Sequence, residues 1–158
     1  MQIYVPFVAA LAGVAMIGGA LAQPAPLPSD KPSGWIADGK TGCKIWDDAP
    51  DPAEKISWSG KCEAGMAEGN GTLQFCIGDT PATLYEGDMR NGRSDGHGVN
   101  LEPGGARYEG GWRNNAADGY GVYTNEGARY EGTWAAGCLK QGATELAVGV
   151  SRQSCGFK

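Results

Sequence analysis

The sequence predicts an all-β protein, built as a thin array of stacked β-hairpins. The hexapeptide Gly-Ala-Arg-Tyr-Glu-Gly occurs twice, at residues 105–110 and 127–132, so the chain contains an internal repeat. Glycine accounts for 27 of the 158 residues, which leaves few large side chains for a deep core and favours turn-rich β structure over a helical bundle. The aromatic residues of each repeat have a period of two, which is the alternation of a strand.

The first 22 residues are expected to form a signal peptide. They carry no charged side chain, are almost wholly apolar from Ile3 to Leu21, and end in Ala20-Leu21-Ala22, a small-x-small cleavage pattern. An uncleaved membrane anchor is the alternative, because the apolar run approaches the ~20 residues that a span requires. Either reading predicts that the rest of the chain is exported, to the periplasm or out of the cell.

Two segments precede the repeats. Residues 23–34 contain four prolines and are predicted to form a semi-rigid linker. Residues 35–55 are predicted to form an N-terminal cap, because Cys43, Ile45 and Trp46 need a surface to pack against.

The repeat array is predicted to cover residues 56–142, and residues 143–158 to form a C-terminal capping tail. The array units begin at aromatic residues, namely Trp58, Tyr85, Tyr108 and Tyr130. The spacing is 23 residues between the second and third, 22 between the third and fourth, and 27 between the first and second. The longer spacing indicates an insertion near residues 76–82.

Each unit is interpreted as a hairpin. In the third unit Tyr108, Gly110 and Trp112 share one face of a strand, and the glycine lets a neighbouring ring lie across the backbone. The following residues 113–119, rich in Asn, Asp and Gly, are expected to form a loop, and residues 119–123 the returning strand. Single hairpins are marginal in water, so successive units must stack edge to edge.

These motifs resemble the MORN repeat (membrane occupation and recognition nexus). The resemblance rests on Tyr-x-Gly-x-Trp, a loop, Gly-x-Gly and a glycine before the next Tyr, and it implies an elongated single-layer antiparallel sheet of stacked hairpins. The chain departs from the pattern at Cys62, at Met89 and at Asn114-Asn115-Ala116, where a loop glycine like Gly92 is expected. These departures concern local packing.

The chain has five cysteines, at positions 43, 62, 76, 138 and 155. If Cys62 and Cys76 lie on one hairpin they are ~13 Å apart, too far for a bridge. We favour Cys43–Cys62 and Cys138–Cys155, which would fasten the flanking segments over the open sheet edges and leave Cys76 free. A zinc site is the alternative, but the sequence contains no Cys-x-x-Cys spacing.

No constellation of residues predicts catalysis, a metal or a cofactor. His97 is the single histidine, and Asn70 and Tyr120 occupy the same repeat position, so it is interpreted as a tolerated strand residue. Glutamates recur once per unit and would form a row of identical environments, whereas acid–base catalysis needs two different ones. We also expect the arginines of the array to pair with this row across the sheet.

The aromatic row is a candidate binding face, interpreted mainly as the core of a thin sheet. Its residues are Tyr85, Tyr108, Trp112, Tyr130 and Trp134. The net charge of −5 weighs against nucleic-acid binding, which needs a cationic surface. Residues 85–142 hold six basic and eight acidic residues, whereas recognition of anionic lipid requires clustered Lys and Arg.

We therefore expect a non-enzymatic exported scaffold that binds a protein or peptide partner, along a groove or by strand addition at a sheet edge. The alternative is a cell-envelope binder of phospholipid head groups or polysaccharide that uses the Tyr/Trp face. The third hypothesis is an enzyme, but the sequence contains no recognisable set of acid, base, nucleophile or metal-binding residues to support it.

Overall fold

The computed structural model describes residues 34–157, and the predicted signal peptide (or anchor) and residues 23–33 of the predicted linker lie outside this range. Twelve strands and a short 3-10 helix, η1 (Gln153–Cys155), occur in the described part. The strands are β1 (Gly34–Ala37), β2 (Lys44–Asp47), β3 (Glu54–Trp58), β4 (Lys61–Glu63), β5 (Met66–Ile77), β6 (Thr80–Arg90), β7 (Arg93–Leu101), β8 (Arg107–Arg113), β9 (Ala116–Asn125), β10 (Ala128–Trp134), β11 (Cys138–Gln141) and β12 (Thr144–Ala147).

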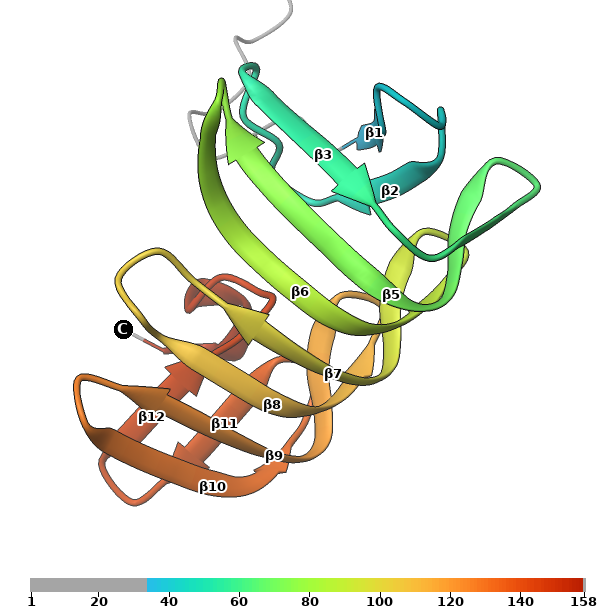
Figure 1. Ribbon diagram of the computed structural model, residues 1–158. Coiled ribbons are helices and arrows are strands. Elements are labelled where there is room, and N and C mark those ends of the chain that lie inside the picture. Colours follow the sequence, from blue (N-terminus) through green and yellow to red (C-terminus); the bar gives the residue numbers. More distant parts are fainter. Residues whose placement is uncertain (1–33, 158) are drawn as a thin grey trace, which may run out of the picture. The chain divides into compact units, whose positions relative to one another are not determined.

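Ten of these strands form one open sheet. Its order is β1-β2-β5-β6-β7-β8-β9-β10, and β3 and β4 both pair with β5. Figure 1 shows β5 to β10 side by side in chain order, as stacked hairpins. Pairing is antiparallel except between β2 and β5, which share one parallel bridge at Lys44 and Met66. The strands β11 and β12 form a separate hairpin. The all-β prediction of stacked hairpins is confirmed.

The turns at one end of the hairpins are tighter than the sequence suggested. Asn91 and Gly92 have φ values of 48° and 72°, and Asn114 and Asn115 have 47° and 69°. Two successive positive φ values are the geometry of a two-residue type I′ turn, which matches the twist of the flanking strands. The loop predicted at residues 113–119 is therefore wrong, because β9 already begins at Ala116. Asparagine tolerates positive φ, so Asn115 replaces the expected glycine.

The insertion near residues 76–82 lengthens a hairpin. It lies where β5, 12 residues long, turns at Gly78 into β6, 11 residues long. The register between these strands shifts between Gln74 and Cys76. The extra residues therefore extend two paired strands and do not form a separate loop.

A row of glycines crosses the middle of the sheet. The strand register aligns Gly71, Gly87, Gly98, Gly110, Gly121 and Gly132 on six neighbouring strands. A Cβ atom built on Gly98 would lie 2.6 Å from Cζ of Tyr85, and one on Gly121 would lie 2.6 Å from Cζ of Tyr108. No side chain fits at these two positions, because a tyrosine ring already covers the backbone. This confirms the expected role of glycine on the packed face.

Aromatic rings stack edge to face along the packed face of the sheet, which we call its inner side. The Trp112 ring centroid lies 5.5 Å from that of Tyr85 and 5.1 Å from that of Tyr108. The ring of Trp134 lies 5.1 Å from Tyr108 on the other side. Such pairs stabilise by about 0.5–1.5 kcal/mol beyond area burial. Each tryptophan thus packs between hairpins and joins one unit to the next.

The polar atoms of the aromatic side chains form the same hydrogen bond in successive units. The hydroxyls of Tyr85 and Tyr108 donate to the carbonyl oxygen three residues further on, over 2.8 and 3.0 Å. Trp58, the aromatic residue of the degenerate first unit, donates from Nε1 to the carbonyl of Lys61, again three residues on, at 2.7 Å. Trp58 therefore occupies the tyrosine position of the repeat, as the alignment predicts.

Two cysteine pairs lie at disulfide distance. They are Cys43–Cys62 and Cys138–Cys155, each with a Cα–Cα distance of 5.7 Å, and they are the two pairs expected from the sequence. Cys76 is a free thiol on β5, opposite Lys55. The first bridge joins the residue before β2 to β4, and the second joins β11 to η1.

Candidate functional site

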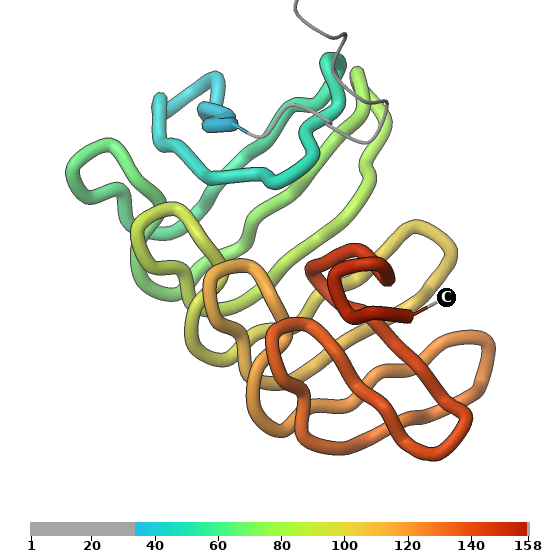
Figure 2. The backbone as a smooth tube through the Cα atoms, turned by 180° about the vertical axis from the view of Figure 1, so that it is seen from behind, coloured from blue at the N-terminus to red at the C-terminus, as the bar shows by residue number. Residues whose placement is uncertain are grey.

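A groove of about 450 Å³ lies over the inner side of the sheet. Its floor is formed by residues of β5 to β8 and one wall by residues 45–49. The other wall is formed by Ala147 and residues 149–151. Figure 2 shows the backbone from behind, with the segment after β2 and the segment after β12 on this side of the sheet. The volume falls within the range of sites that hold ligands.

The floor opens where a row of aromatic residues is interrupted. The register aligns Tyr85, Asn100, Tyr108, Tyr123 and Tyr130 across five strands, from β6 to β10. Asn100 and Tyr123 occupy the same position after Gly-x-Gly in consecutive units. The smaller asparagine leaves space that a tyrosine ring would fill, and its amide offers a donor and an acceptor. Asn100 lines the groove.

The N-terminal wall is held in place by backbone and side-chain hydrogen bonds. The Trp46 N–H donates to the Gly92 carbonyl over 2.8 Å, and the Asn115 side-chain amide donates to the Trp46 carbonyl over 3.0 Å. The Trp46 ring packs edge to face on Trp35, at 5.2 Å, and the Arg93 guanidinium lies 4.9 Å from its centroid. Contacts between residues far apart in the sequence therefore fix this wall.

The C-terminal wall is attached to the turns of the last hairpins. The Ala117 N–H donates to the Val148 carbonyl over 3.3 Å, and the Val148 N–H donates to the Gly137 carbonyl over 2.8 Å. Val148 is buried, with 3% of its surface exposed. The Cys138–Cys155 bridge joins the two ends of the segment that contains this wall, and so closes the segment into a loop.

Three carboxylates line the groove. Asp47 and Asp48 belong to the N-terminal wall, and Glu102 follows β7. Asp48 accepts a hydrogen bond from Trp46 Nε1 at 2.8 Å, and Asp47 accepts one from the Ala49 N–H at 2.7 Å. None of the ion pairs between residues 34 and 157 involves these three side chains. The lining contains no lysine or arginine.

A further carboxyl group, Glu54, lies beside Asp47. Burial raises the pKa of Glu54 to about 7, and the neighbouring carboxylates of Asp47 and Asp51 act in the same direction. Its Oε2 atom is buried and has no hydrogen-bond partner in the described structure. The N-terminal wall therefore carries an excess of negative charge, part of it removed by protonation near neutral pH.

Most of the predicted aromatic face is inaccessible. Tyr85, Tyr108, Trp112 and Trp134 expose 2%, 1%, 7% and 1% of their surface, and Tyr130 is half-buried. The rings fill the thin core, which is their structural interpretation, and Tyr85 and Trp112 also contribute to the groove.

Sequence reasoning missed Asn100 and the wall carboxylates. The mismatch of Asn100 with Tyr123 in the aligned units is a signal that could have found the opening. The wall has no such signal, because it lies outside the repeats.

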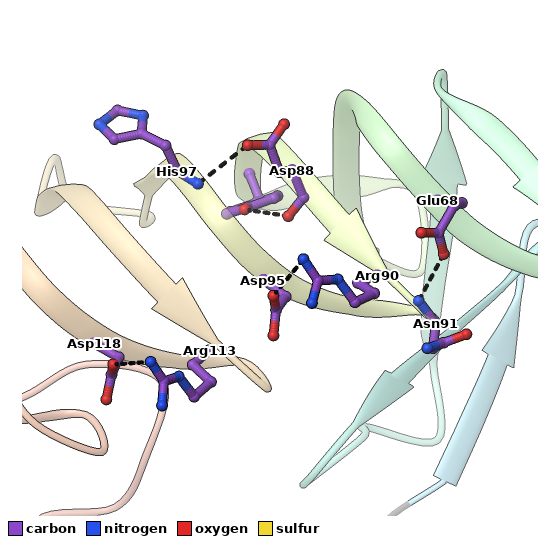
Figure 3. Close-up of polar contacts among 9 residues, drawn as sticks. Glu68, Asp88, Arg90, Asn91, Asp95, His97, Arg113 and Asp118 are labelled. Carbon is purple, nitrogen blue, oxygen red and sulfur yellow. Dashed lines mark hydrogen bonds and ion pairs between the residues drawn. The ribbon is translucent and has the colours of Figure 1, made fainter.

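The same Arg–Asp ion pair occurs in two successive hairpins. Arg90 pairs with Asp95 at 3.5 Å and Arg113 pairs with Asp118 at 3.2 Å, in corresponding positions of two hairpins (Figure 3). The His97 backbone N–H donates to Asp88, and the residue is exposed (Figure 3). No cluster of His, Cys, Asp and Glu within residues 34–157 could hold a metal ion.

The expected cross-sheet pairing of the hexapeptide arginines is wrong. Arg107 pairs with Glu109 at 2.7 Å, and Arg129 pairs with Glu131, both two residues further along the same strand. The register places Val99 or Val122 opposite each of these glutamates, so a cross-strand partner is apolar. Side chains two residues apart share one face of a strand, which brings Arg and Glu together.

The repeat family is supported by comparison with family models. The MORN repeat model matches residues 63–80, 85–99 and 108–126. With the stacked hairpins, these matches support a MORN-repeat protein. MORN repeats generally act as protein- or membrane-interaction modules and are generally non-enzymatic.

A search of curated proteins found no match to the chain. In the described range, no helix has the length and apolar character to span a membrane.

Proposed function

We propose that the protein is an exported, non-enzymatic interaction module that binds a protein or peptide segment in the groove. The observation that carries this proposal is the groove itself, whose floor is the repeat array and whose walls come from the segments on either side of it. Open grooves with an apolar floor and a few polar groups suit extended peptides. The interaction role of MORN repeats in general agrees with it.

The architecture proposed for this role has three parts. The array covers residues 56–142, the cap residues 35–55, and the tail residues 143–158. Each flanking segment supplies one wall of the groove and one half of a cysteine pair. The caps therefore protect the ends of the array and also shape the binding site.

Export is supported by the cysteine pairs and by the predicted leader. Disulfides persist in oxidising compartments, and two pairs here lie at bridging distance. A periplasmic or secreted location follows if the leader is cleaved after Ala22, and an anchored form follows if it is not. The intact mass of the exported protein, with and without reduction, distinguishes these cases and counts the bridges.

A cell-envelope binder of phospholipid head groups or polysaccharide is the alternative. Its expected surface, the Tyr/Trp face, is mostly buried, so the rings cannot stack on a ligand without opening the core. The net charge of −5 also opposes anionic lipid. We retain this alternative as an outcome of the test.

The test is capture from a cell-envelope extract with the folded protein and a matched groove-filling variant, Asn100→Tyr. Tyrosine already occupies this position in the next unit, at Tyr123, so the variant should fold while the opening closes. We expect a partner that the wild-type protein retains and the variant does not, with no binding to glycans or liposomes. Equal capture by both proteins, or binding to glycan or liposome alone, would contradict the proposal.

A further inference from the structure

The groove combines an apolar floor with lining carboxylates that form no ion pair in the described residues. Leu73 and Phe75 of β5 contribute apolar surface next to the N-terminal wall, and Tyr85 of β6 continues it. Asp47, Asp48 and Glu102 lie around this surface. Charged groups beside a low-dielectric surface act more strongly than they do in open water.

Six acidic side chains of the described residues have a cationic partner in an ion pair. The paired residues of the described structure are Asp79, Asp95, Glu109, Asp118, Glu131 and Glu145. Asp47, Asp48 and Glu102 of the groove are not among these six. A ligand that carries a positive charge would supply the missing partner.

Arg93 and Arg152 make no ion pair with the groove carboxylates. Arg93 lies 4.9 Å from the Trp46 ring and 5.3 Å from the Trp35 ring, so its guanidinium is stacked on the tryptophan pair. Arg152 donates to the Glu145 carbonyl over 2.7 Å and lies 5.5 Å from the Phe157 ring. Neither neutralises the groove from within, because neither belongs to its lining.

We infer that the partner of this groove is an extended cationic peptide segment, with a Lys or Arg side chain between the wall aspartates and Glu102 and an apolar neighbour on Leu73, Phe75 and Tyr85. This inference rests on the proposed function and specifies its ligand. The remaining carboxylate oxygens accept from the ammonium or guanidinium group. The Asn100 amide pairs with the peptide backbone at the gap in the tyrosine row.

Selection of random octapeptides on the immobilised full-length protein tests the inference. We expect the enriched peptides to share a Lys or Arg one or two positions from an apolar residue. The best peptide is then compared with versions that carry norleucine or glutamate in place of the cation. Norleucine should weaken binding about tenfold, glutamate should weaken it further, and added salt should weaken the cationic peptide alone.

Variants of the protein assign the effect to the groove. Asp48→Asn combined with Glu102→Gln should reduce affinity for the cationic peptide about tenfold and leave the norleucine version unaffected. Glu86→Gln, on an exposed residue outside the groove, is the matched control and should change neither. Asn100→Tyr should abolish binding of both peptides.

The outcomes separate the two proposals. Enrichment of apolar or acidic peptides that lose binding in Asn100→Tyr would overturn the cationic specificity and leave the proposed function standing. Absence of enrichment, or enrichment unaffected by Asn100→Tyr, would overturn the peptide groove and the inference together.

Discussion

Asn115 donates a hydrogen bond from its side-chain amide to the carbonyl of Trp46, over 3.0 Å and across 69 residues of sequence. The same side chain accepts a hydrogen bond from the Ser94 N–H at 2.9 Å. Its backbone has a φ of 69°, close to the 72° of Gly92 in the equivalent turn. One residue thus closes a hairpin turn and attaches the N-terminal wall of the groove to the array.

Replacing Asn115 by glycine should separate these two roles. Asn115→Gly keeps the positive φ but removes both hydrogen bonds, so we expect a loss of about 1–2 kcal/mol in the free energy of unfolding. Amide exchange should become faster at residues 44–47. Asn115→Ala should cost about 1 kcal/mol more, because an alanine is strained at positive φ. Urea unfolding and hydrogen exchange measure these effects. Wild-type exchange rates in β2 of Asn115→Gly would contradict the role of Asn115 in attaching the N-terminal wall.

The hairpins could be predicted from the sequence because their signals are local. Gly110 lies two residues after Tyr108, so the period of two places both on one face. Gly121 follows Tyr108 at the same offset as Gly98 follows Tyr85. The walls could not be predicted in this way. Trp46 is held by hydrogen bonds to Gly92 and Asn115, and neither the repeat nor the periodicity of the sequence predicts these contacts. The cysteine pairs were the exception, because hairpin geometry excluded Cys62–Cys76 and the need to cover open sheet edges favoured bridges to the flanking segments.

A second prediction concerns the glycine row. Gly121→Ala should destabilise the fold by about 2 kcal/mol or more, because its Cβ would lie 2.6 Å from ring atoms of Tyr108, which is itself buried. Gly39→Ala is the control, since no heavy atom lies within 4 Å of a Cβ at that position. Thermal unfolding of the two variants measures the difference. Similar melting temperatures of the two variants would show that the Tyr108 ring can pack without a glycine at position 121.

A third prediction concerns the C-terminal wall. Removing the Cys138–Cys155 pair by a double Ser substitution opens a segment with a sequence separation of 17 residues, and we expect a loss of about 3 kcal/mol. The groove should also lose affinity for its peptide, because Ala147 and Val150 lie within that segment. Cys76→Ser is the matched control and should leave both properties unchanged. Peptide mapping without reduction that links Cys76 to another cysteine would contradict this assignment.

The last prediction follows from the buried carboxyl group of Glu54. Burial and the nearby Asp47 and Asp51 raise its pKa in the folded state to about 7, from the ordinary value of 4.5. Between these two values the folded protein holds a proton that the unfolded chain has lost, so stability should fall as the pH rises from 4.5 to 7 and then level off. Partial exposure screens the charges, so we expect a change of about 1 kcal/mol. Urea unfolding at pH 5 and pH 8 should show this drop in the wild-type protein and a smaller one in Glu54→Gln. Glu86→Gln, an exposed control, should behave as wild type, and an unchanged drop in Glu54→Gln would place the titration on another group.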